Sequence, residues 1–254
     1  MNISAIIITR NEENNIAGCL ASLGFADEII VVDSGSTDRT REICERNPKV
    51  RFHVDTHWEG YGVQKNRALD LATGEWILSI DADETVTSEL AEEIRRILQR
   101  PTCDGYIMKR KNLYRGRWIR HSGWWPDHIL RLFRKGRGRF SNRLVHESVV
   151  LDGAQGRLEN CIEHHSFRNV GDFFRKAENY SSLGARLMFE RGETTSAMNA
   201  LFKSTLTFFK TLVLKRGFLD GSAGVLIAFS NAMGVFYRHM KCLELQSEKH
   251  DSRQ

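Results

Sequence analysis

In Glu75-Trp76-Ile77-Leu78-Ser79-Ile80-Asp81-Ala82-Asp83, an apolar run ends in two closely spaced carboxylates. The apolar residues predict a buried strand of an α/β sheet, and the end of such a strand is where these sheets bind ligands. An Asp-x-Asp pair there can hold a metal-bound phosphate, although a solvated turn or a helix N-cap gives the same pattern. The meaning of the pair therefore depends on the sequence around it.

Two earlier apolar runs end in the same way. One, at 4–9, leads into Asn11 and Glu12, and the next leads into Asp33. Strands that alternate with helices wind into a parallel sheet, so these polar side chains and Asp81 are expected side by side at its carboxyl edge. The spacing of apolar residues predicts the intervening helices at 12–23, 36–46, 62–72 and 86–98, and a short strand at 50–54.

Four motifs in this order resemble those of glycosyltransferase family 2, whose nucleotide-sugar-binding fold is called GT-A. They are Asn11-Glu12, Val32-Asp33-Ser34-Gly35-Ser36-Thr37-Asp38, Lys65-Asn66-Arg67-Ala68-Leu69 and Asp81-Ala82-Asp83-Glu84. The resemblance implies an α/β fold with a Rossmann-like, mostly parallel central sheet flanked by helices. It also implies an inverting glycosyltransferase.

Later motifs narrow the resemblance to lipopolysaccharide core β-1,4-glucosyltransferases of the WaaE/KdtX type. They are Gly123-Trp124-Trp125-Pro126-Asp127, Leu130-Arg131-Leu132-Phe133-Arg134, Val145-His146-Glu147 and Gly217-Phe218-Leu219-Asp220-Gly221. Such enzymes transfer a hexose, usually glucose from UDP-glucose, to an inner-core heptose on a lipid A-anchored acceptor. The resemblance thus implies a UDP-sugar and a lipopolysaccharide core as partners, at the inner face of the cytoplasmic membrane.

A metal ion is expected because sugar transfer releases a diphosphate whose added negative charge must be stabilised. Mg²⁺ or Mn²⁺ suits this task, and both prefer oxygen ligands. Asp83 is the expected direct ligand, with Asp81 placed to touch the ribose or a metal-bound water. His146 could complete the metal shell or bind the diphosphate, although a lone histidine is as often structural.

The remaining donor contacts are expected from both sides of the nucleotide. Asp33 would accept hydrogen bonds from the uracil or ribose, and Asn11 and Glu12 belong to the same nucleotide-sugar site. Lys65 and Arg67 would face phosphate as fixed positive charges, unless they occupy an exposed helix face.

Inversion needs a base that takes the proton of the acceptor hydroxyl. Asp127 is the leading candidate because it follows Trp124 and Trp125, whose indole rings could stack on a sugar, with a stiffening proline between. Glu147 is the second candidate. The alternative is that both tryptophans pack in the protein and Asp127 belongs to a turn.

Charge divides the chain. Residues 1–100 contain 11 basic and 18 acidic residues, whereas the whole chain contains 37 and 32, so the later part is strongly basic. Arg131 and Arg134 lie in its most basic stretch, 109–143, and are assigned to the acceptor. A diphosphate, a phosphorylated lipopolysaccharide core or nucleic acid would suit such a surface. The first part is acidic and contains the candidate metal ligands, which argues against nucleic acid as the partner.

Residues 170–241 predict three helices separated near Gly192 and Gly217. Apolar residues Phe202, Leu206, Phe209 and Val213 share one helix face, with Lys203, Lys210, Lys215 and Arg216 nearby. Docking to an anionic membrane surface and a helical cap on the catalytic core both fit this pattern. The apolar run that begins at Ala223 is too short and polar for a comfortable span.

The expected organisation is a catalytic domain at 1–168, with a nucleotide-sugar half at 1–100 and an acceptor half at 101–168. A helical, membrane-associated region at 169–246 and a frayed tail at 247–254 follow. No signal peptide is visible and the five scattered cysteines lack a metal or redox spacing, so a cytoplasmic protein with reduced thiols is expected. The 41% hydrophobic content excludes a disordered chain.

Two other functions fit parts of the pattern. A nucleotidyltransferase also combines an α/β sheet with metal-binding acids, but it normally carries a glycine-rich phosphate loop, which residues 9–12 are not. An inactive peripheral membrane or scaffold protein could retain the same fold. The candidate site argues against that loss of activity, because it retains Asp33, Asp81, Asp83 and Asp127.

Overall fold

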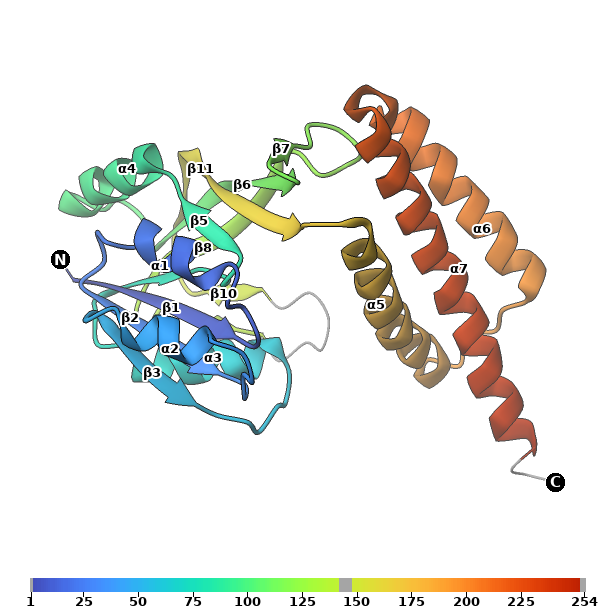
Figure 1. Cartoon of the computed structure of the whole chain (residues 1–254), viewed down its shortest axis with the longest axis horizontal. Coiled ribbons are helices and arrows are strands. Elements are labelled where there is room, and N and C mark those ends of the chain that lie inside the picture. Colours follow the sequence, from blue (N-terminus) through green and yellow to red (C-terminus); the bar gives the residue numbers. More distant parts are fainter. Residues whose placement is uncertain (1, 142–147, 252–254) are drawn as a thin grey trace. The chain divides into compact units, whose positions relative to one another are not determined.

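The computed structural model describes residues 2–141 and 148–251. The chain forms two compact units that are each discontinuous in sequence. The larger unit comprises Met1–Lys111 and Asp127–His165, and the smaller comprises Asn112–Pro126 and Ser166–Gln254. Figure 1 shows the sheet of the larger unit with helices packed on it, and the long helices of the smaller unit.

A mixed sheet forms the centre of the larger unit, with nine strands among the described residues. Four parallel strands in the order β3-β2-β1-β4 form one side: β1 (Ile3–Thr9), β2 (Glu28–Asp33), β3 (Val50–Val54) and β4 (Trp76–Ser79). The sheet continues through β8 (Asp127–Arg134), β6 (Gly105–Tyr114), β11 (Gln155–Phe167) and β5 (Glu84–Val86), and β7 (Arg117–Trp118) pairs with β6. A separate pair joins β9 (Gly138–Phe140) to β10 (Val149–Leu151).

The direction of β8 decides which of its residues reach the ligand edge. It runs antiparallel to β4, with Arg134 opposite Trp76 and Leu132 opposite Leu78. Its first residue, Asp127, therefore lies toward the end at which β1, β2 and β4 finish, which we call the carboxyl edge. Arg134 lies at the opposite, amino edge.

Both faces of β1, β2 and β4 are buried, which explains why their sequences are largely apolar, whereas the edge strand β3 is partly exposed. Ile7 and Val31 pack into one core cluster, whereas Ile6, Ile30 and Val32 pack into the other. Helices cover the sheet: α1 (Ile16–Ser22), α2 (Thr40–Glu45), α3 (Tyr61–Leu71) and α4 (Ser88–Gln99). The predicted mixed α/β architecture is confirmed.

Three helix starts differ from the predictions. Helix α2 begins at Thr40 instead of 36, and the starts of α1 and α4 differ for local reasons. Asn11 adopts a positive φ of 56°, and a turn that bonds Asn15 N–H to the Glu12 carbonyl precedes α1, so this helix begins four residues later than expected. Val86 belongs to β5 and is buried in the core, where it pairs with β11. Thr87 then caps α4 by accepting a hydrogen bond from Leu90 N–H.

Three long helices form most of the smaller unit: α5 (Val170–Glu190), α6 (Ala197–Phe209) and α7 (Ser222–Asp251). The central helix is α7, which contacts both α5 and α6 (Figure 1). The short helices η1 (Lys210–Leu214) and η2 (Gly217–Asp220) connect α6 to α7. Because α7 continues to Asp251, it includes most of the segment expected to fray. Within the described residues, no helix is both long and apolar enough to cross a membrane.

Asp220 explains the motif at 217–221. Its buried carboxylate accepts hydrogen bonds from the backbone N–H groups of Arg120 and His121, at 3.1 and 3.0 Å, and from the Ser122 hydroxyl at 3.0 Å. A single side chain thus holds a turn about a hundred residues earlier in the chain, within the same unit.

Candidate active site

The loops after β1 and β2 are tied together at the carboxyl edge. Asp33 is buried and accepts hydrogen bonds from the N–H groups of Gly35 and Ser36, at 3.0 and 2.8 Å. Gly35 has a φ of +86°, a conformation that glycine adopts without steric cost. Asn11 donates its N–H to the Ser36 hydroxyl at 2.8 Å. The structure therefore brings Asn11 and Asp33 into neighbouring loops, as the parallel topology predicted.

Glu12 is held in the same place. Its N–H donates to the Thr40 hydroxyl at 2.8 Å, and its carboxylate accepts from the Asn15 side chain at 2.7 Å. These contacts fix the β1–α1 loop against the start of α2, so the predicted nucleotide-binding loops have a defined shape.

Asp81 lies between two buried cations. Lys65 from α3 approaches its carboxylate at 2.9 Å, and Arg131 from β8 forms an ion pair with the same group. Burial disfavours the charged form of Asp81, but the attraction of Arg131 and Lys65 outweighs it and lowers the pKa of Asp81 well below its usual range. Asp81 is therefore ionised at neutral pH, and Lys65 and Arg131 carry fixed positive charge at this edge.

The charges continue beyond Arg131 as an alternating series. Arg131 also contacts Glu84 at 2.9 Å, Glu84 contacts Arg110 at 3.1 Å, and Arg110 contacts Asp127 at 2.8 Å. Glu84 is fully buried, and it also accepts the Asp81 N–H at 2.9 Å. Burial lowers the pKa of Arg110, yet the attraction of Glu84 and Asp127 exceeds this and raises it overall. We call this series the ion-pair chain: Lys65, Asp81, Arg131, Glu84, Arg110 and Asp127.

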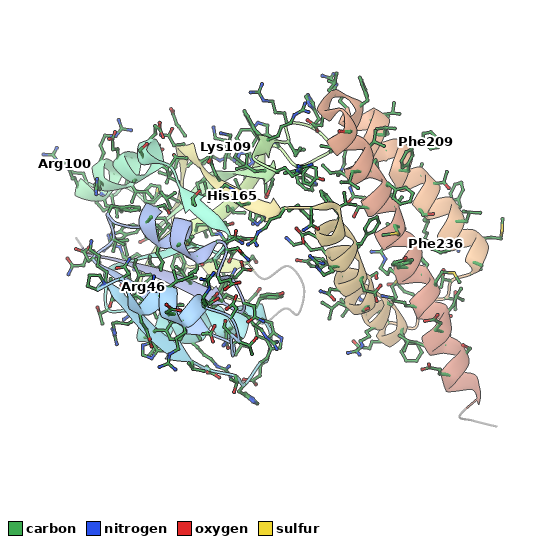
Figure 2. The ribbon with its side chains drawn as sticks, in the orientation of Figure 1. Arg46, Arg100, Lys109, His165, Phe209 and Phe236 are labelled. Carbon is green, nitrogen blue, oxygen red and sulfur yellow. The ribbon has the colours of Figure 1, made fainter. Side chains whose placement is uncertain are left out.

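Asp83 lies beside a histidine from another strand. Its Oδ2 is 3.2 Å from Nε2 of His164 on β11, and its carbonyl accepts the N–H of His165, which Figure 2 labels. Two ligands of one octahedral Mg²⁺ or Mn²⁺ lie about 3 Å apart, so this carboxylate and imidazole fit such an ion. No group of three or more potential metal ligands occurs within 2–141 and 148–251. Phosphate oxygens and water normally supply the remaining ligands of such an ion.

Several predicted site residues lie elsewhere or have other partners. Arg67 pairs with Asp55 at 3.3 Å and with Glu59, in the loop before α3. Arg134 lies at the amino edge, where it pairs with Glu75 at 2.8 Å. The structure does not bring either arginine to Asp81. His146 and Glu147 lie outside the described residues.

The two tryptophans belong to the smaller unit. Trp124 stacks on Phe167 with ring centroids 5.3 Å apart and also lies beside Phe173. Trp125 meets Trp118 edge to face at 4.8 Å. Both indoles thus have aromatic packing partners, and the sugar-stacking role remains a prediction.

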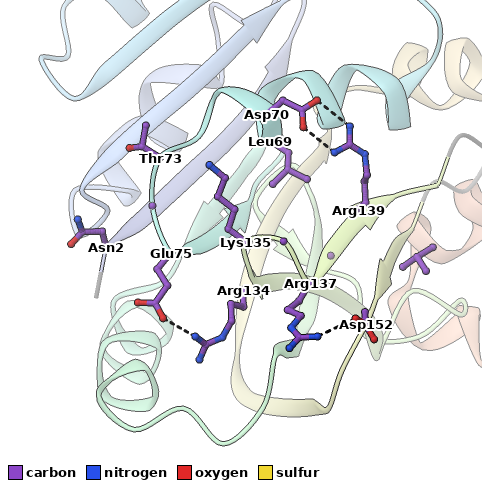
Figure 3. Close-up of a pocket in the computed structure, with 14 residues that line it drawn as sticks. Asn2, Leu69, Asp70, Thr73, Glu75, Arg134, Lys135, Arg137, Arg139 and Asp152 are labelled. Carbon is purple, nitrogen blue, oxygen red and sulfur yellow. Dashed lines mark hydrogen bonds and ion pairs between the residues drawn. The ribbon is translucent and has the colours of Figure 1, made fainter.

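A pocket of about 990 Å³ lies at the amino edge, away from the ion-pair chain (Figure 3). Its lining contains three ion pairs between an arginine and a carboxylate: Arg134 with Glu75, Arg137 with Asp152, and Arg139 with Asp70. Of the predicted site residues it includes Arg134 alone. We therefore place the candidate active site at the carboxyl edge, where the convergent acids and buried cations lie, rather than in this pocket.

Sequence reasoning assigned no role to Glu84, Arg110 or His164. Glu84 directly follows Asp83, the predicted metal ligand, so its place in the sequence could have identified it as a site residue. Arg110 and His164 reach the site from strands far away in sequence, and only the pairing of β6 with β8 and of β11 with β5 places them there.

Comparisons with known proteins agree with this geometry. A family model described as "Glycosyl transferase family 2" matches residues 4–151. An uncharacterized glycosyltransferase of Rickettsia typhi is 32% identical and aligns over 96% of this chain and 87% of its own. The lipopolysaccharide core biosynthesis glycosyltransferase LpsC of Rhizobium meliloti is 29% identical over 93% of each chain.

Among solved structures, residues 1–349 of TarS from Staphylococcus aureus share the fold. That structure has a TM-score of 0.51 and 16% identity, and the alignment covers 98% of this chain and 92% of the other. The family match spans more than half of the chain, and the sequence relatives align along nearly all of it. The chain is therefore a glycosyltransferase with a GT-A fold, and it belongs to glycosyl transferase family 2.

Proposed function

We propose that this enzyme transfers a hexose, with inversion, from a UDP-sugar to an inner-core heptose of lipopolysaccharide or a similar lipid-linked glycan. Glucose is the proposed hexose. The ion-pair chain is the observation that carries the proposal. It connects Asp81, in the proposed nucleotide-sugar site, to Asp127, the proposed base. Support for the acceptor comes from LpsC, whose name assigns it to lipopolysaccharide core biosynthesis. TarS, which shares the fold, has been solved with UDP-GlcNAc.

The donor is proposed to bind across the carboxyl edge. Asp33 would contact the uracil or ribose, with Asn11 and Glu12 shaping the neighbouring loop, because these residues end adjacent parallel strands. Lys65 and Arg131 supply positive charge for the diphosphate, while Asp81 holds both cations in position. Arg67 lies on the same helix as Lys65 and is retained as a secondary phosphate contact.

Asp83 and His164 are the residues proposed to hold a divalent ion, Mg²⁺ or Mn²⁺. When bound, such an ion would stabilise the charge of the departing UDP. Asp81 would contribute through the ribose or a metal-bound water. His146 remains a further proposed ligand.

Asp127 is proposed as the base. It would accept the proton of the acceptor hydroxyl while that oxygen bonds to the anomeric carbon and the bond from this carbon to UDP breaks. Arg110, which contacts Asp127 at 2.8 Å, orients the carboxylate. Glu147 is the alternative base, and Trp124, Trp125 and Arg131 remain the proposed acceptor contacts. Arg134 is withdrawn as an acceptor contact, because it lies at the amino edge and pairs there with Glu75.

The acceptor of such a reaction is anchored in a membrane, so we place the enzyme in the cytoplasm at the inner face of the cytoplasmic membrane. UDP release should be measured with Mn²⁺ and a panel of UDP-sugars, with and without heptose-terminated lipopolysaccharide core. Release that requires both UDP-glucose and the core is the expected result. Release that requires another donor or acceptor would replace the proposed substrates. No release and no UDP binding under any condition would overturn the proposed activity.

A further inference from the structure

Helix α6 has the reverse of the usual distribution of side chains. The residues that it buries are small, Ala200 and Ser204, whereas large apolar residues are exposed to solvent. Met198 and Phe202 are 73% and 67% exposed. A helix that packs in water normally turns its large apolar residues inward, because their burial is the main source of its stability.

The exposed residues form one continuous surface that extends into η1. We call this surface the α6 face: Met198, Leu201, Phe202, Leu206, Phe209, Val213 and Leu214. Figure 2 shows Phe209 among the side chains on the side of α6 away from α7. The exposed Phe218 and Leu219 of η2 follow directly in the chain. Contiguous apolar surfaces of this kind mark interaction sites.

Charge narrows the kind of partner. The sequence from Thr194 to Leu219 contains four basic residues, Lys203, Lys210, Lys215 and Arg216, and no acidic residue. Lys203 and Lys210 are seven residues apart, so they project from the same flank of α6, beside the apolar side chains. Large apolar residues bordered by cations match the interface of a bilayer that contains anionic lipids.

Small residues on the other side of α6 fit the same environment. Ala200 and Ser204 are small and buried, so they allow close approach of α6 to α7, which it contacts. Helices that meet through small residues can hold together without burying large apolar side chains between them. The large residues of α6 are then left for lipid.

We infer that the α6 face docks in the plane of an anionic membrane surface, with its apolar side chains among the lipids and Lys203 and Lys210 against the headgroups. This docking needs no spanning helix, and none of the described helices meets the requirements for a span. Docking would bring the proposed transferase to a lipid-linked acceptor. It requires neither donor nor acceptor, so it can be tested separately from transfer.

The experiment is flotation of the full chain with vesicles of phosphatidylcholine alone or with added phosphatidylglycerol. Wild-type protein is expected to bind the anionic vesicles. The double substitution Phe202→Ser, Phe209→Ser should weaken binding at least about tenfold, because two apolar side chains no longer enter the interface. Val150→Ser, which alters an equally exposed residue of the larger unit, is the matched control and should bind like wild type.

A charge reversal provides an independent test. Lys210→Glu should weaken binding to anionic vesicles severalfold and leave weak binding to neutral vesicles unchanged. Arg186→Glu, at an exposed position on α5, is the control for net charge and should have a smaller effect. Circular dichroism should be the same for all variants, because the replaced side chains are exposed.

Two results would overturn the inference. One is equal binding of wild type and the Phe202→Ser, Phe209→Ser variant to anionic vesicles. The other is a wild-type dimer in light scattering without lipid that this variant converts to a monomer while vesicle binding is unchanged, since the face would then be an interface between two copies of the chain. If the protein bound vesicles but released no UDP with a soluble acceptor in the absence of detergent, the proposed function would fail and the docking inference would stand.

Discussion

The two edges of the sheet in the larger unit carry charges in different ways. At the amino edge three arginines form separate pairs with carboxylates, as Arg139 does with Asp70 at 2.9 and 3.0 Å, and these pairs are exposed. At the carboxyl edge Asp81, Arg131 and Glu84 share partners in a chain that passes through the protein interior.

The two arrangements differ in how far each charge depends on its neighbours. Exposed pairs contribute about 0–1 kcal/mol each and do not depend on one another. A buried series is costly to desolvate, and removing one member leaves its neighbours uncompensated. In the pocket at the amino edge, three arginines form separate, exposed pairs with carboxylates of the lining.

Breaking the ion-pair chain at its centre should have the largest effect. Arg131→Met leaves both Asp81 and Glu84 with one cation fewer, so we expect a loss of about 3–5 kcal/mol in the free energy of unfolding. Arg139→Met at the amino edge is the control and should cost less than about 1 kcal/mol. Urea denaturation measures both. Equal losses would remove the distinction between the two edges.

The amino edge has one strongly held carboxylate, Glu28, which tests how far the comparison extends. Burial raises its pKa, but hydrogen bonds from Ser4 and Thr73 outweigh this and lower it from 4.5 to about 2. Because the pKa is lower in the folded state, the stabilisation is complete above about pH 4.5 and is lost as the pH falls toward 2.

The wild type should thus lose roughly 3 kcal/mol of unfolding free energy from Glu28 across this interval. Glu28→Gln should be less stable at neutral pH and should lack this part of the acid dependence. Denaturation at a series of pH values gives the difference between the two proteins. A difference independent of pH would mean that Glu28 is not held as described.

At the exposed end of the ion-pair chain, Asp127→Asn should preserve UDP-sugar binding and reduce turnover at least about a hundredfold, because an amide cannot accept the proton. Calorimetry with a UDP-sugar and steady-state kinetics with the acceptor separate the two effects. A variant that binds acceptor weakly but turns over at the wild-type rate would favour Glu147 as the base.

The smallest expected change concerns the metal. His164→Gln should raise the Mn²⁺ concentration for half-maximal activity at least about tenfold, because one ligand is weakened. His165→Gln is the matched control, since its ring approaches Thr85 at 3.4 Å instead of Asp83. Binding of Mn²⁺ in the presence of UDP, followed by electron paramagnetic resonance, provides a second measurement. Equal behaviour of the two variants would exclude His164 as a ligand.

The carboxyl edge could be predicted because its parts repeat a local pattern. Asp33 and Asp81 each follow an apolar strand, and parallel pairing places β1 and β2 in register through Thr9 and Asp33. Arg110 and His164 could not be found in the same way, since they lie on strands whose neighbours are chosen by tertiary structure. The prediction places Val86 in a helix, because short apolar runs occur in both helices and strands and the pattern does not separate them.

The helical unit illustrates a different limit. Periodicity correctly grouped Phe202, Leu206 and Phe209 on one face of α6. It left open whether this face packs on protein or meets lipid, since both require apolar residues at the same spacing. In the structure this face is exposed, and the residues that α6 buries are Ala200 and Ser204 on its opposite side.

Asp220 sets a condition for exchanging parts between related enzymes. The turn at 120–122 obtains its hydrogen bonds from a residue between α6 and α7, and Ile119 packs with Phe173 and Ile227 in the same small core. A chimera that replaces only the residues after 168 would separate these partners and leave the turn without its acceptor. Grafting the helical unit onto another enzyme of the family therefore requires two inserts, 112–126 and 166–251, taken from the same parent.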